Sequence, residues 1–264
     1  MKSVLVRGIG DIGSTVAHRL HREGHGVVIH DIPSPTWTRR KMALTDAIFD
    51  GEAFLDGVGA TRMDQLSALG GRARPTTIAV SVHDFDALVQ TLRPDILVDA
   101  RMRKRQVPER QIHLAECTVG LGPGFIAGMT THLVIETAWG TTLGAVIGER
   151  SASPQEGAPR TLGGFGIERV VYAPAPGIFA SDFAIGDDVA VGQVVAHVGS
   201  RSLAAPLGGR IRGLTRSGVQ VNTGTKVIEI DPRGDDAIVT GIGERPAMIA
   251  EGVLRAIHAS WPKS

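Results

Sequence analysis

The feature that most restricts the fold is an internal repeat in residues 173–230, with an offset of 32 residues and no gaps. Ala173-Pro174 recurs as Ala205-Pro206, and further glycine and aliphatic positions keep the same offset. These matched pairs are Gly177 and Gly209, Gly186 and Gly218, Gly192 and Gly224, Val189 and Val221, Val195 and Val227, and Val198 and Ile230. Two copies of so short a unit cannot bury their apolar faces alone and must pack on each other. Short strands broken by glycine turns therefore predict a small two-fold β sandwich or barrel.

A second constraint is the glycine-rich turn that separates an apolar strand, residues 2–6, from a helical pattern over residues 12–23. The turn reads Gly8-Ile9-Gly10-Asp11-Ile12-Gly13, and the acidic Asp31 ends the next strand, 18 residues after Gly13. In this pattern Gly8 allows the tight turn, Gly10 lets backbone reach a pyrophosphate, and Gly13 lets the helix pack closely on the strand. The helix N-terminus would donate N–H groups to phosphates, and Asp31 would accept ribose hydroxyls.

Strands and helices alternate through the first half of the chain, which favours a mostly parallel sheet covered on both faces. Residues 150–166 are polar and rich in Gly and Pro, and we place a domain boundary there. The expected fold class is α/β, with a Rossmann-like nucleotide-binding domain over residues 1–155. A small all-β barrel-sandwich hybrid is expected over residues 165–235, and a C-terminal helix over residues 245–260.

Composition excludes several classes of protein. The net charge is +1 and 21% of residues are charged, so neither a nucleic acid nor a membrane surface is expected as a partner. The single cysteine excludes an internal disulfide framework and suits a reducing compartment. The chain runs directly into its first strand, leaving no room for a signal peptide, and no apolar run approaches the roughly 20 residues that span a bilayer. We expect a cytoplasmic protein.

Polar residues at the carboxyl ends of the predicted strands extend the candidate binding site. Arg7 could aim its charge at a phosphate or pair with a carboxylate such as Asp31. Asp99 and Arg101 could line the ligand crevice or form a structural ion pair. The turn over residues 120–124, which includes Gly122 and Gly124, could hold a phosphate or simply connect two strands.

Two basic runs also have two interpretations each. Arg39-Arg40-Lys41 could meet a 2′-phosphate or lie in a solvated loop, and Arg103-Lys104-Arg105 could bind an anion or form a solvated face. No spacing of the nine histidines indicates a metal site, and no nucleophile motif is present. Only Asp99 and His132 are available as proton-transfer groups, and no motif supports either. No catalytic residue is therefore assigned.

Four segments together resemble the accessory proteins of the selenium-dependent molybdenum hydroxylase system. They are Val4-Leu5-Val6-Arg7-Gly8-Ile9-Gly10-Asp11, Leu97-Val98-Asp99-Ala100-Arg101-Met102, Gly120-Leu121-Gly122-Pro123-Gly124-Phe125 and Asp231-Pro232-Arg233-Gly234. The likeness runs along nearly the whole chain in the same order, with a shortened segment before residue 92. It implies a role in maturing or inserting the molybdenum cofactor of xanthine dehydrogenase-like hydroxylases.

The repeat separately resembles the biotinyl/lipoyl carrier fold, through Ala173-Pro174-Ala175-Pro176-Gly177, Gly186-Asp187-Asp188-Val189 and Gly192-Gln193-Val194-Val195. Carriers hold a modified lysine at the hairpin that joins the two halves. Here that hairpin reads Gly199-Ser200-Arg201-Ser202-Leu203, so covalent biotin or lipoate is not expected. The resemblance implies a docking or dimerisation module.

The leading hypothesis is an accessory protein that binds a nucleotide or dinucleotide, either NAD(P) or molybdopterin cytosine dinucleotide. Its expected partners are a client molybdenum hydroxylase, cofactor-maturation proteins or a second copy of the chain. One alternative is an NAD(P)-dependent oxidoreductase acting on a small molecule. Another is a scaffold that has kept the fold without a ligand.

Overall fold

The structure is a computed structural model that describes residues 1–69, 76–103, 106–154 and 159–260. The chain forms two compact units. The first consists of Met1–Pro33, Ala43–Glu156 and Ile242–Ser264, and the second of Ser34–Met42 and Gly157–Gly241. The segment Ser34–Met42 had been expected within the first domain. It belongs to the second unit because its backbone bonds there: Thr38 O accepts from Leu214 N–H at 2.8 Å.

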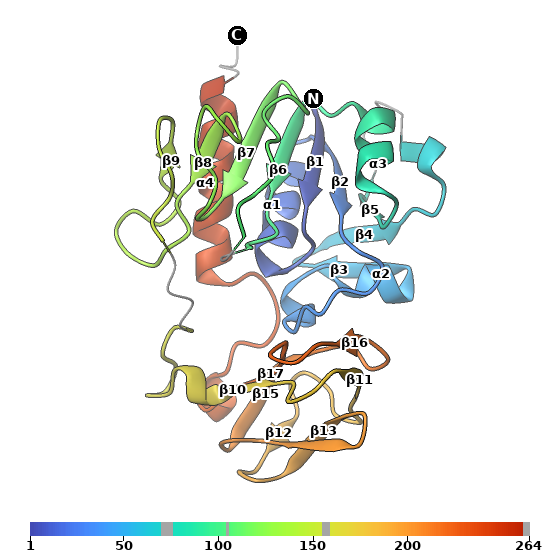
Figure 1. Ribbon diagram of the computed structural model, residues 1–264, viewed down its shortest axis with the longest axis vertical. Helices are drawn as coiled ribbons and strands as arrows, with labels where there is room; N and C mark the ends of the chain where they lie inside the picture. The colour runs from blue at the N-terminus through green and yellow to red at the C-terminus, as the bar shows by residue number, and fades with distance from the viewer. Residues whose placement is uncertain (70–75, 104–105, 155–158, 261–264) are drawn as a thin grey trace. The chain divides into compact units, whose positions relative to one another are not determined.

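The first unit is built on a nine-stranded sheet with the order β3-β4-β5-β2-β1-β6-β7-β8-β9 (Figure 1). The seven inner strands of this order, from β4 to β8 across the sheet, pair in parallel. The edge strands β3 and β9 pair antiparallel to their neighbours. The nine strands are β1 Ser3–Arg7, β2 Gly26–His30, β3 Glu52–Leu55, β4 Val58–Arg62, β5 Ile78–Ser81, β6 Ile96–Asp99, β7 Cys117–Leu121, β8 Leu133–Ile135 and β9 Val146–Ile147.

The expected fold class, a Rossmann-like parallel sheet followed by a barrel-sandwich hybrid, is wrong. The first unit has a mixed sheet with antiparallel edges, and the second has two separate four-stranded sheets. The β3–β4 edge turns at Asp56 and Gly57, whose φ angles of +42° and +79° form a tight two-residue hairpin. Both strands are partly exposed, so they lack the continuous apolar run on which the prediction relied.

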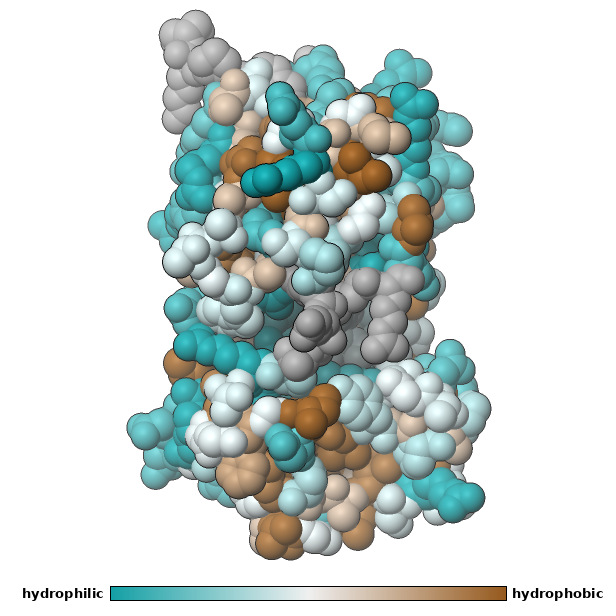
Figure 2. Space-filling view, turned by 60° about the vertical axis from the view of Figure 1, so that its left-hand side comes forward, coloured by the Kyte–Doolittle hydropathy of each residue, from teal (hydrophilic) through white to brown (hydrophobic). Residues whose placement is uncertain are grey.

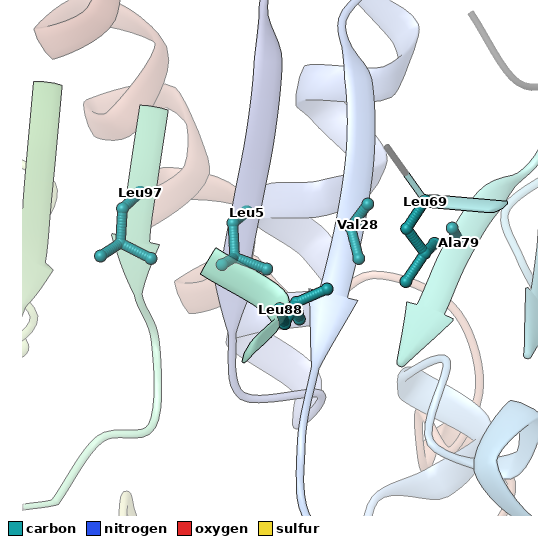
Figure 3. Close-up of a cluster of buried hydrophobic side chains, with 6 residues drawn as sticks. All are labelled: Leu5, Val28, Leu69, Ala79, Leu88 and Leu97. Carbon is teal, nitrogen blue, oxygen red and sulfur yellow. The ribbon is translucent and has the colours of Figure 1, made fainter. Parts of the chain in front are cut away.

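Helices cover both faces of the nine-stranded sheet. On one face Leu88 of α3 packs with Leu5, Val28 and Leu97 of three neighbouring strands in a buried cluster (Figure 3). Because successive strand residues point to opposite faces, the buried Val6 points to the other face, where α1 and α4 pack on each other. The helices are α1 Asp11–Arg22, α2 Asp46–Asp50, α3 Phe85–Leu92 and α4 Glu244–Ser260.

The C-terminal helix α4 therefore belongs to the first unit. Its Gly252 allows a close approach, because a Cβ at that position would lie 2.3 Å from Gly144 O. In the parts of the chain that the structure describes, no helix has the length and apolar character needed to cross a bilayer.

The second unit contains two antiparallel sheets with the orders β10-β17-β15-β12 and β14-β13-β11-β16. Their strands are β10 Val170–Tyr172, β11 Gly177–Ala180, β12 Asp188–Val189, β13 Val194–Val198, β14 Arg201–Ala204, β15 Gly209–Leu214, β16 Gln220–Val221 and β17 Lys226–Asp231. The starts of β11, β12 and β13 recur as β15, β16 and β17 at the 32-residue offset of the sequence repeat. One sheet pairs β12 of the first copy with β15 of the second, and the other pairs β11 of the first copy with β16 of the second, so the copies interdigitate around buried side chains such as Phe179 and Val195.

Candidate functional site

The glycine turn lies at the carboxyl end of β1 and requires glycine at two positions. Gly8 has a φ of +109°, and a Cβ there would lie 3.0 Å from the backbone of Ala100 and from Arg101 N. A Cβ at Gly13 would lie 1.8 Å from Gly8 O. Glycine thus lets β1, the end of β6 and the start of α1 meet without side chains between them.

Gly10 and Asp11 form the start of α1. Gly10 is the N-cap residue, with a φ of −63° and a ψ of −179°, and it provides no side-chain cap. Asp11 Oδ1 accepts from Ile12 N–H at 3.0 Å. A helix N-terminus presents backbone donors and the positive end of the helix dipole, which suits an anion.

Asp31 follows β2 and holds the glycine turn through hydrogen bonds to the backbone. Its Oδ2 accepts from Ile9 N–H at 2.8 Å, and its Oδ1 accepts from Ile32 N–H at 2.8 Å. The turn is therefore held in shape by a carboxylate at the position where the sequence predicted a ribose contact.

Three arginines surround the carboxylate of Glu109. Arg7, Arg101 and Arg103 all donate to it, and Arg101 Nη2 does so at 2.7 Å. Arg7 thus pairs with a carboxylate, as one interpretation of the sequence had it. Arg103 belongs to the same cluster, whereas Lys104 and Arg105 lie outside the described residues. The cluster joins the carboxyl ends of β1 and β6 to the segment that follows β6.

Asp99 holds Arg101 in place. Its buried carboxylate accepts from Arg101 Nε at 3.0 Å and 3.1 Å, and from Gln111 Nε2 at 2.8 Å. Because these donors take up both oxygens, the geometry makes Asp99 a positioning group for Arg101 rather than an available base. The other candidate base, His132, has Nδ1 3.1 Å from Thr118 N, whose N–H donates to it.

Aromatic and charged groups set the electrostatics of the cluster. The Arg7 guanidinium lies 3.6 Å from the centre of the Phe85 ring, and the His30 ring packs 5.4 Å from the same ring. Burial, reinforced by the neighbouring charge of Arg101, lowers the pKa of Arg7. Burial also lowers the pKa of His30, which favours a neutral imidazole. Burial alone would raise the pKa of Glu109, but a hydrogen bond from its own backbone N–H and further ones from Arg101 and Arg103 hold it far below its usual range.

The second glycine turn lies against this cluster. Gly122 has a φ of +86° and donates its N–H to Ile135 O at 3.0 Å. Gly124 has a φ of +92°, and a Cβ there would lie 3.0 Å from Pro108 Cδ. The turn therefore packs on the segment that carries Glu109.

The structure brings most of the sequence-predicted residues to one edge of the sheet, and it adds others that the sequence did not single out. Glu109 and Gln111 lie in an irregular segment between β6 and β7, where no periodic pattern marks them. Phe85 at the start of α3 was also missed. The one available signal was Asp84, which caps α3 through Ala87 N–H at 3.0 Å and so fixes where Phe85 begins the helix.

The basic run that begins at Arg39 is bonded within the second unit instead. Arg39 pairs with Glu229 at 2.8 Å, and Arg40 Nε donates to Leu214 O at 2.9 Å. Within the described residues, no group of three or more His, Cys, Asp or Glu side chains is placed to hold a metal ion.

The chain has a sequence relative among curated proteins. No family model matches the chain. The chain is 39% identical over 258 residues, 96% of its length, to the uncharacterized protein YqeB of Escherichia coli K12. It spans 47% of that protein, about half of the relative's length.

Structural similarity to solved proteins is weak. The ectoine utilization protein EutE (DoeB) of Ruegeria pomeroyi aligns over 87% of this chain and 86% of its own, with 11% identity and a TM-score of 0.25. A succinylglutamate desuccinylase of Silicibacter sp. TM1040 aligns over 87% and 84%, with 13% identity and a TM-score of 0.26. At these TM-scores the alignments support no conclusion about fold or activity.

Proposed function

We propose that the first unit binds a phosphate-bearing nucleotide at the carboxyl edge of its sheet, as an accessory protein in the maturation of a molybdenum hydroxylase. The observation that carries the binding proposal is the glycine turn. A Cβ at Gly8 would lie 3.0 Å from Arg101 N, so the turn that precedes α1 adjoins a residue of the arginine cluster. Backbone donors and guanidinium groups are the two devices with which proteins hold phosphates.

The residues present fit such a ligand. Gly10 is buried and adds no side chain to the start of α1, so no side chain of its own would separate a phosphate from the backbone there. The Nε atom of Arg7 is buried without a hydrogen-bond partner, so the cluster has donor capacity in reserve. The dinucleotide form of the molybdenum cofactor and NAD(P) both carry a pyrophosphate, and we propose the former as the physiological ligand. The maturation role rests on the motif resemblance.

The second unit is proposed to dock a partner, either the client hydroxylase, a cofactor-maturation protein or a second copy of the chain. Its β13–β14 hairpin turns at Gly199-Ser200 and offers no lysine for a covalent cofactor. Large apolar side chains of this unit are exposed, among them Val191 and Ile178. The face drawn in Figure 2 mixes hydrophobic and hydrophilic side chains on both units, so it singles out no docking patch.

Calorimetric titration with NAD, NADP, CTP and molybdopterin cytosine dinucleotide tests the proposal. We expect the cytosine-bearing ligands to bind, and Gly10→Ala to weaken them about tenfold, or roughly 1.4 kcal/mol. The Gly10 backbone suits alanine, so the variant is expected to fold. Gly148→Ala is the matched control, since a Cβ there meets nothing within 4 Å.

Two results would overturn this function. Binding of NADP alone, with an absorbance change on adding a reductant, would indicate the oxidoreductase. No binding of any of the four ligands would indicate a scaffold.

A further inference from the structure

Glu109 is the most exposed member of the charge cluster in the first unit. Its side chain is 45% exposed, against 13% for Arg7, 18% for Arg101 and 32% for Arg103. It lies outside every helix and strand, so its side chain can leave the arginines without breaking regular structure.

Each of the three arginines has a second contact that does not involve Glu109. Asp99 binds Arg101, the Phe85 ring supports Arg7, and Gln106 Oε1 accepts from Arg103 at 3.3 Å. Asp99 is itself held by Gln111, which is fully buried. The arrangement of guanidinium groups therefore does not depend on the carboxylate at its centre.

The charges of the cluster do not balance without an anion. Three guanidinium groups face the carboxylates of Asp99 and Glu109, and removing Glu109 would leave Asp99 alone against all three. Like charges held close together in a partly buried place favour an anion among them. Guanidinium groups bind carboxylate and phosphate oxygens with the same forked geometry, so a phosphate can take the place of a carboxylate.

We propose that Arg7, Arg101 and Arg103 form a subsite for the pyrophosphate of the bound nucleotide, and that Glu109 fills this subsite until the ligand displaces it. The inference rests on the proposed function, because the glycine turn adjoins the subsite through Gly8 and Arg101. The Glu109 carboxylate then acts as an internal competitor. It lowers the apparent affinity by the fraction of molecules in which it occupies the subsite.

The test is calorimetric titration of the full chain with inorganic pyrophosphate and, separately, CTP at low ionic strength. We expect Glu109→Gln to bind both about tenfold more tightly than wild type, because the competing charge is gone. Glu109→Asp keeps the charge but has a shorter side chain, so its affinity is expected to lie between those of wild type and Glu109→Gln. Arg103→Met is expected to bind more weakly.

The matched control is Glu116→Gln, which removes an exposed carboxylate of the same unit that pairs with Lys2 at 3.4 Å. We expect it to bind as wild type does. An equal gain in the control would show a general charge effect and overturn the inference.

Other outcomes separate the inference from the proposed function. CTP binding that Glu109→Gln leaves unchanged or weakens would overturn the inference and leave the nucleotide proposal standing. Tighter binding of pyrophosphate without any binding of CTP would support the anion subsite and overturn the nucleotide proposal. Failure of both Glu109 variants to fold would contradict the independent support of the arginines, and with it the inference.

Discussion

Each unit holds a carboxylate among several cationic side chains, but the two carboxylates are buried to different degrees. In the first unit, Glu109 is 45% exposed and lies in an irregular segment. In the second unit, Glu229 is fully buried on β17 and accepts from Arg39, Arg169 and Lys226. A carboxylate surrounded by cations therefore occurs once near solvent and once in the interior.

The buried carboxylate joins parts of the chain that are far apart in sequence. Arg39 comes from the inserted segment Ser34–Met42, and the fully buried Arg169 also donates to Arg160 O at 3.0 Å. Burial alone would raise the pKa of Glu229, but the charges of Arg39 and Lys226 hold it well below the usual range. Removing one partner of a buried pair leaves an uncompensated charge, whereas an exposed pair is rescreened by water. We infer that burial separates a structural ion pair from an exchangeable one.

The largest expected effect is on the buried anchor. Glu229→Gln should destabilise the protein by about 3–5 kcal/mol, because the surrounding cations, among them the fully buried Arg169, lose their counter-charge. Denaturant unfolding monitored by circular dichroism measures the change. A loss as small as that caused by Glu109→Gln would erase the distinction between the two clusters.

A smaller loss of stability is expected from Gly13→Ala, at the place in the first unit where α1 packs on the glycine turn with no side chain between them. Gly13→Ala would place a Cβ 1.8 Å from Gly8 O, and overpacking of this kind costs about 1–3 kcal/mol. Thermal unfolding compared with Gly148→Ala checks this. Wild-type stability for Gly13→Ala would show that the turn adapts, and that the close approach of α1 is not required.

Acid should act on the second unit through Glu229. The pKa of this carboxyl is lower in the folded protein than the ordinary value of about 4.3 in the unfolded chain. The contribution of Glu229 to the free energy of unfolding is therefore complete above the pKa of the unfolded chain. It is lost as the pH falls toward the lower pKa of the folded protein. Unfolding free energies measured from pH 7 to pH 3 should fall in wild type below about pH 4. The fall should be shallower in Glu229→Gln, and parallel curves would assign the acid sensitivity to other groups.

The smallest effect is expected at Glu109. Glu109→Gln should change stability by no more than about 1 kcal/mol, because the carboxylate is partly exposed and each arginine has another contact. Denaturant unfolding at low salt measures this change. A loss of several kcal/mol would make Glu109 an anchor like Glu229.

Local patterns predicted a definite part of this structure. The glycine turn was identified because Gly8 and Gly13, which the structure requires to be glycine, lie within one short stretch of sequence. The repeat was identified because residues match at a fixed offset, and its strands recur at that offset. Asp99 and Arg101 were candidates because a strand ends there, and the structure joins them in one ion pair.

Long-range pairing could not be predicted in this way. The insertion of Ser34–Met42 depends on Thr38 meeting β15, where a Cβ at Gly213 would lie 3.0 Å from Thr38 Oγ1. Nothing near residue 38 in sequence signals that contact. Glu109 was missed because an irregular segment has no periodicity, and its meaning depends on three arginines from different parts of the edge.

The most direct test of the account is a crystal structure of the full chain with inorganic pyrophosphate. The account predicts the anion among Arg7, Arg101 and Arg103, with the Glu109 side chain turned away and Glu229 still hydrogen-bonded to Arg39, Arg169 and Lys226. Pyrophosphate bound elsewhere while Glu109 keeps its arginine contacts would contradict it.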